Sequence, residues 1–217
     1  MSIALYALMK GDLYQLQANC MVAKLWRTIL YDLNVSPSIW EERLRDYIEK
    51  AEGIIGKTEA DRLKGNIPKS LINDHVSFQA LCRAVTILRF KRVIFTVHTF
   101  RGEEHKHNSI VIPETYDGKS GGLYLKTLWV LITQAYPEVT ANWSEYVKTY
   151  KERVNKEYGG GAVNLGGNIT STLNKDRITW KNFYDGLMIH GFDKIAIEVT
   201  LERSAGLPPK KIGITAS

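Results

Sequence analysis

The sequence predicts an α+β fold, a tandem duplication of a module with three helices and a β-hairpin, preceded by an N-terminal helical extension. The stretch from Gly65 to Ile112 matches the stretch from Gly167 to Ile214, 102 residues later, without a gap. Helical periodicity precedes β-rich runs in both stretches. Tryptophans also recur at matched positions, Trp26 with Trp129 and Trp40 with Trp143. We expect an extension (1–19), a first module (20–113), a linker (114–121) and a second module (122–217).

The first two helices of each module follow from apolar spacing. Leucines in residues 3–18 predict a short helical extension that packs across both modules. The first helix is expected over 20–33 and again over 122–135. The second is expected over 38–51 and 141–157, because apolar residues recur at intervals of three and four. Polar connectors at Glu52–Lys64 and Gly159–Gly166 are predicted to be loops.

A third helix and a hairpin complete each module. Ser77 and Thr179, together with Asp74 and Asp176, offer capping oxygens for helices that start near Phe78 and Trp180. Alternating β-branched runs follow and predict strands. The predicted order is a strand from Val93 or Ile195, a polar turn over Arg101–His107 or Arg203–Pro209, and a short strand at Ile110–Ile112 or Ile212–Ile214.

Composition indicates a soluble protein with a core of its own. The chain is 44% hydrophobic and 24% charged, which is ordinary for a globular protein. No run approaches the length of a membrane span, and the start lacks the pattern of a signal peptide. The two cysteines, Cys20 and Cys82, agree with a reducing compartment, and we expect Cys82 to be buried. A cytoplasmic location without a membrane partner is therefore expected.

The charge balance suggests an anionic partner. The chain has 29 basic and 23 acidic residues, a net charge of +6, and a pI near 9.2. Both halves share the excess, which favours nucleic acid as the partner, although many proteins with a basic pI bind none. The candidate nucleic-acid-binding residues lie on the third helices and around the hairpins: Arg83, Arg89, Lys91, Arg92, Arg101, Lys106, Lys175, Arg177, Lys181, Lys194, Lys210 and Lys211.

Motifs for catalysis are weak. The stretch Ala51–Thr58 fits a loose Walker pattern, but a charged amphipathic helix precedes it where a buried strand is needed. Asp74 and Asp176 could form an acid pair across a two-fold, although helix capping explains both. Cys20 and Cys82 lie in no nucleophile motif. We therefore expect a protein that is not an enzyme.

Three histidines near the first hairpin, His98, His105 and His107, include a His-x-His pair of the kind that binds metals. The second half has Thr200, Leu207 and Pro209 at those positions, and no cysteine or carboxylate set completes a tetrahedral site. We interpret the three as exposed hairpin side chains, and no metal or cofactor is predicted.

Helices followed by a hairpin are typical of winged-helix domains, which bind DNA, although the connector before the third helix is long for that fold. The leading hypothesis is therefore duplex DNA binding through basic surfaces of the two modules. The alternative is a protein-interaction module, either a viral structural component or an inhibitor of a host factor. A third hypothesis is an enzyme that acts on a phosphate-rich substrate in a cleft between the modules.

Two segments resemble uncharacterised repeat-containing proteins of tailed bacteriophages. They are RITWKNFYDGL, at the third helix of the second module, and LKGNI, before the third helix of the first module. The resemblance implies a viral origin, a location in the host cytoplasm and a role other than catalysis. It brings no catalytic residues with it.

Overall fold

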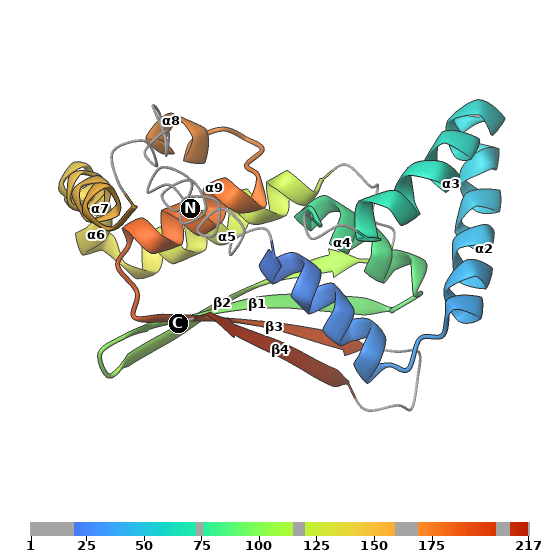
Figure 1. Ribbon diagram of the computed structural model, residues 1–217, viewed down its shortest axis with the longest axis horizontal. Coiled ribbons are helices and arrows are strands. Elements are labelled where there is room, and N and C mark those ends of the chain that lie inside the picture. The colour runs from blue at the N-terminus through green and yellow to red at the C-terminus, as the bar shows by residue number, and fades with distance from the viewer. Residues whose placement is uncertain (1–19, 73–75, 115–119, 159–168, 203–208, 217) are drawn as a thin grey trace, which may run out of the picture.

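The computed structural model describes residues 20–72, 76–114, 120–158, 169–202 and 209–216. The expected extension over 1–19 and the connector at Gly159–Gly166 lie outside the described residues. Helices and one antiparallel sheet of four strands make up the fold, as expected for the α+β class (Figure 1). Strands from both halves of the sequence form this one sheet.

The sheet has the strand order β2-β1-β3-β4. Its strands are β1 (Arg92–Arg101), β2 (Glu104–Pro113), β3 (Lys194–Glu202) and β4 (Lys210–Ala216). β1 and β3 pair antiparallel at the centre, and Thr96 lies opposite Glu198. The two hairpins are therefore joined through their first strands. No local sequence pattern predicts this pairing.

The first hairpin turn is much shorter than expected. A polar turn over Arg101–His107 was predicted, but β1 reaches Arg101, which pairs with Glu104 at the start of β2. Only Gly102 and Glu103 connect the strands, and Gly102 has a φ of +56°, which glycine adopts without strain. The prediction was wrong because polar residues suit a loop and an exposed edge strand equally well.

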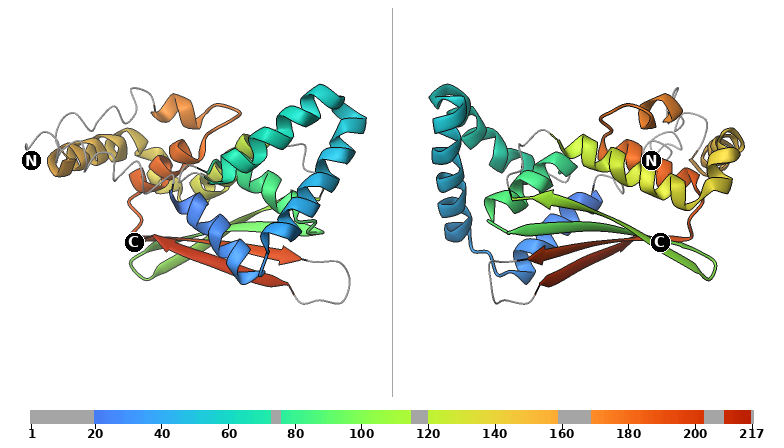
Figure 2. Two further views of the ribbon diagram at one scale, coloured as in Figure 1. Left: turned by 45° about the vertical axis from the view of Figure 1, so that its right-hand side comes forward. Right: turned by 180° about the vertical axis from the view of Figure 1, so that it is seen from behind.

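Helices cover one face of the sheet (Figure 2). On β1 the covered side chains, Val93, Phe95 and Val97, are buried, whereas Ile94 and His98 on the other face are only half-buried. Since successive strand residues point to opposite faces, this alternation identifies the face that the helices leave open. We call it the open face.

In the described part of the first half, four helical segments precede the sheet. Residues 20–32 form a helix, followed by α2 (Pro37–Ile55), α3 (Lys57–Ile72) and α4 (Phe78–Ile87). The expected loop at Glu52–Lys64 is therefore wrong, because α2 continues to Ile55 and α3 fills the rest. Gly56, with a φ of +82°, separates the two helices. One side of α3 is buried through Ala60, Ile67 and Leu71. The free energy gained by this burial outweighs the helix-propensity cost of Gly65 and Pro68.

The second half follows a similar order. Its helices are α5 (Gly121–Ala135), α6 (Pro137–Ala141), α7 (Trp143–Tyr158), α8 (Ile169–Leu173) and α9 (Trp180–Ile189). The matched tryptophans pack alike in the two halves. The rings of Trp26 and Trp40 are 5.4 Å apart at 66°, and those of Trp129 and Trp143 are 5.6 Å apart at 69°.

α4 and α9 meet in the middle of the helical layer. Ser77 and Thr179 cap their first turns, as expected. Phe78 of α4 stacks on Trp180 of α9, with ring centroids 6.1 Å apart. These two residues are 102 positions apart in the sequence, as are Thr96 and Glu198 in the sheet. Cys82 of α4 is fully buried, as expected, and burial raises the pKa of its thiol.

Candidate nucleic-acid interface

Five of the predicted basic residues lie at one end of the sheet. Because β1 and β4 run in the same direction, both begin at this end. Lys211 of β4 lies opposite Thr200, which in turn lies opposite Ile94 near the start of β1. We call this group the basic end, and its members are Arg89, Lys91, Arg92, Lys210 and Lys211. The group draws three cations from the first half of the sequence and two from the second.

Carboxylates accompany three of these cations. Arg89 donates to Asp46 of α2 at 2.5 Å, Arg92 lies 3.7 Å from Glu202, and Lys211 lies 3.3 Å from Glu198. The side chains of all three pairs are partly exposed. Such pairs contribute about 0–1 kcal/mol each, so a phosphate can replace the carboxylate at small cost. Lys210 donates to the carbonyl of Asp32 at the end of the first helix.

Arg101 has a structural role instead. Its guanidinium donates to Glu138 of α6 at 2.8 Å and to the backbone carbonyl of His190 at 2.6 Å. It also lies over the rings of Tyr136, at 4.9 Å, and Phe192, at 5.2 Å. The two hydrogen bonds use both terminal nitrogens of the guanidinium, and the two rings, whose centroids are 4.9 Å apart, pack beside each other against it.

Lys106 and Lys181 also have partners within the protein. Lys106 donates to the carbonyl of Ala135 at 2.6 Å and lies 2.7 Å from Glu104, whose hydrogen bond raises the pKa of the amine. Lys181 pairs with the buried Asp185 at 3.2 Å. Burial raises the pKa of that carboxyl, and the Lys181 charge offsets part of the effect.

The other predicted cations do not join the basic end. Lys175 and Arg177 are exposed just before α9, in the segment that leads to its cap. Lys194 begins β3 at the far end of the sheet, where its amine lies 5.2 Å from the Phe100 ring. Arg83 is half-buried on α4. The structure therefore brings together five of the predicted residues and disperses the rest.

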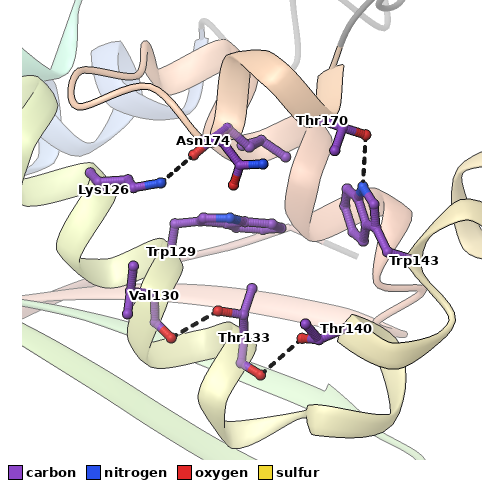
Figure 3. Close-up of a pocket in the computed structure, with 9 residues that line it drawn as sticks. Lys126, Trp129, Val130, Thr133, Thr140, Trp143, Thr170 and Asn174 are labelled. Atoms are coloured by element: carbon purple, nitrogen blue, oxygen red, sulfur yellow. Dashed lines mark hydrogen bonds between the residues drawn. The ribbon is translucent and has the colours of Figure 1, made fainter.

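A cavity of about 230 Å³ lies among α5, α6, α7 and α8, next to the matched tryptophans (Figure 3). Trp129 and Trp143 line it, and Lys126 enters from α5. Two of the polar groups have internal partners: Lys126 donates to the Leu173 carbonyl at 2.8 Å, and the Trp143 indole donates to Thr170 at 2.9 Å. These bonds hold the helices around the cavity together.

His190, at the end of α9, lies in an aromatic enclosure under this cavity. It is fully buried, with the ring of Trp129 at 5.2 Å and that of Phe192 stacked on it at 5.2 Å. Neither ring nitrogen has a hydrogen-bond partner within the described residues. Burial, and then the nearby Arg101 charge, lower the pKa of His190 to about 4. The imidazole is therefore neutral at pH 7.

Three side chains that the sequence interpretation set aside lie together on the open face. His105 and His107 are exposed, as expected, and His98 is half-buried beside them. The His98 Nδ1 and His105 Nε2 atoms are 3.1 Å apart. If the sequence had predicted a two-residue turn at Gly102–Glu103, it would also have predicted that His98 lies opposite His107.

The remaining candidates for chemistry do not assemble. Gly56 connects two helices rather than a strand and a helix, so Ala51–Thr58 lacks the phosphate-binding context of a Walker loop. Asp176 is exposed, and Asp74 lies outside the described residues, so neither the acid pair nor helix capping by Asp74 is tested.

Neither a protein family, nor a curated protein, nor a solved structure matches this chain. In the part of the chain that the structure describes, every helix is too short or too polar to cross a membrane.

Proposed function

We propose that this chain is a non-enzymatic protein that binds duplex nucleic acid through the basic end. The observation that carries the proposal is the gathering of Arg89, Lys91, Arg92, Lys210 and Lys211 from both halves of the sequence at one end of one sheet. Phosphates are contacted by exposed cations spread over one surface. We place the protein in the cytoplasm, that of the host cell if it is viral.

The ion pairs at the basic end fit this role better than the contacts of Arg101, Lys106 and Lys181 do. Arg101 is held by a carbonyl and a carboxylate, whereas the contact of Arg92 is a long surface pair. Exchanging a surface carboxylate for a phosphate keeps the cation paired and releases counterions from the nucleic acid. We therefore exclude Arg101, Lys106 and Lys181 from the proposed interface.

We also infer that the chain arose by tandem duplication, with modules at 20–113 and 122–217. The like geometry of the two tryptophan pairs supports this inference. So do the contacts between corresponding residues, Phe78 with Trp180 and Thr96 with Glu198. The winged-helix comparison and the viral origin stay predictions.

A binding experiment with paired variants tests the proposed function. Fluorescence anisotropy of a short labelled duplex is measured at low salt with the wild type, with Lys91→Ala/Lys211→Ala, and with the control Lys148→Ala/Lys156→Ala on α7. We expect the first double variant to bind about tenfold more weakly and the control to match the wild type. No binding by the wild type, or equal losses in both variants, contradicts the proposal. A single strand of the same sequence shows whether the duplex is preferred.

The protein-interaction alternative has one observation in its favour. At the junction of α2 and α3, Ile54 is 85% exposed and Ile55 is 45% exposed. Exposed apolar side chains that are adjacent can mark a contact for another protein. A pull-down from nuclease-treated lysate separates the two functions. A partner that survives nuclease and is lost with Ile54→Ser/Ile55→Ser favours this alternative.

A further inference from the structure

The three histidines of the first hairpin form a group that neither the nucleic-acid proposal nor the packing of the core uses. His98 lies directly opposite His107 across the β1–β2 pair. His105 precedes His107 by two residues on the same strand, so its side chain projects from the same face. The three imidazoles thus form a triangle on the open face.

The spacing of the rings suits one shared ion. Two imidazole nitrogens bound to one zinc ion at bond lengths of about 2.0–2.1 Å lie roughly 3.3 Å from each other in tetrahedral geometry. The His98 Nδ1 and His105 Nε2 atoms are already 3.1 Å apart. Ring centroids lie 5.3 Å apart for His98 and His105, 5.9 Å for His98 and His107, and 6.3 Å for His105 and His107.

The three imidazole rings have to turn to complete the site. With the side chains as they stand, no three His, Cys, Asp or Glu residues among the described ones surround a metal position. His98 and His105 instead share a hydrogen bond. His107 is exposed at the edge strand, so rotation about its side-chain torsions is not opposed by packing. A metal between His98 and His105 replaces the shared hydrogen, which moves to the other nitrogen of the same ring.

A carboxylate lies on the open face near His98. Glu198, on β3, lies opposite Thr96 and pairs with Lys211 at 3.3 Å. The two charges of this pair oppose each other, so the pair adds no net charge beside a bound ion.

We propose that His98, His105 and His107 bind one divalent transition-metal ion of the zinc, nickel or copper class on the open face. Imidazole ligands suit these ions, whereas magnesium and calcium prefer oxygen ligands. Three histidine ligands leave a fourth coordination position facing solvent. The corresponding positions of the second half hold no histidine, so we expect one such ion per chain. The proposal does not depend on nucleic-acid binding.

Isothermal titration calorimetry of the full-length chain without a histidine tag tests the proposal, with zinc chloride as the probe and magnesium chloride as the control. We expect one zinc ion per chain, no heat from magnesium, and at least about tenfold weaker zinc binding in each of His105→Gln and His107→Ala. His190→Leu, which replaces a buried histidine, should bind zinc like the wild type.

His105 and His107 are exposed, so their variants should keep the far-ultraviolet circular dichroism spectrum of the wild type. The proposal is overturned if the wild type binds no zinc. It is also overturned if both variants, folded by that spectrum, bind zinc as tightly as the wild type.

Discussion

The Arg101 guanidinium, at the end of β1, donates a hydrogen bond of 2.6 Å to the backbone carbonyl of His190, at the end of α9. The two residues lie 89 positions apart in the sequence, so this bond ties the first hairpin to the last helix. Arg101 therefore contributes to the packing of the fold.

Replacing Arg101 should destabilise the protein. Arg101→Ala removes the bonds to Glu138 and His190 and the contacts over two aromatic rings, and we expect a loss of about 2–3 kcal/mol in the free energy of unfolding. Arg92→Ala, which removes a surface pair 3.7 Å long, should cost less than about 1 kcal/mol. Urea denaturation of both variants provides the comparison. Equal losses would show that Arg101 contributes no more than a surface cation.

The buried His190 should make stability depend on pH. Its pKa is about 4 in the folded chain and 6.5 in the reference state, so the unfolded state takes up the proton first. The contribution is fully present above pH 6.5 and is lost as the pH falls towards 4, by up to about 3 kcal/mol. His190→Leu should remove this dependence, because leucine cannot be protonated. Leucine is chosen because Leu88 occupies the corresponding position in the first half.

The measurement for His190 is the free energy of unfolding by urea at pH 7 and at pH 4.5, in the wild type and in His190→Leu. We expect the difference between the two proteins to shift in favour of the variant as the pH falls. Parallel pH dependences in the two proteins would rule out His190 as the cause.

Two glycines in helices should respond to alanine in opposite directions. A Cβ atom at Gly186 of α9 would lie 2.6 Å from the Trp129 side chain, so Gly186→Ala should destabilise the protein by about 1–3 kcal/mol. At Gly65 of α3 nothing lies within 4 Å of such an atom. Gly65→Ala should therefore stabilise by about 0.5–1 kcal/mol through helix propensity. Thermal unfolding of the two variants checks the signs, and a gain from Gly186→Ala would contradict the packing around Trp129.

The sequence pattern predicted most helices, both hairpins and the caps at Ser77 and Thr179, because these depend on local spacing. It failed at α3, where the polar composition of Glu52–Lys64 suggested a loop but the burial of Ala60, Ile67 and Leu71 stabilises a helix. It also could not predict the pairing of β1 with β3, since that pairing depends on contacts about a hundred residues apart. The residue pattern of one strand shows which side chains share a face, but not which other strand it pairs with.

The candidate site was predictable in residue type more than in place. Charge patterns proposed the basic residues but could not separate Arg92 from Arg101, whose partners lie in α6 and at the end of α9. The histidine group was noticed but interpreted as exposed hairpin side chains, because the second half lacks it and no cysteine or carboxylate set completes a tetrahedral site. The two-residue turn places His107 opposite His98 and His105 opposite Phe100.

The salt dependence of duplex binding by the wild-type chain tests the central claim most directly. Five cations at the basic end predict that the logarithm of the association constant falls linearly with the logarithm of salt concentration, with a slope between about −3 and −4.5 at roughly 0.9 per phosphate contact. Fluorescence anisotropy across a salt series gives the slope. A slope in this range, reduced by about 2 in Lys91→Ala/Lys211→Ala, is the predicted result. A slope near zero, or no binding at the lowest salt concentration, would contradict the account.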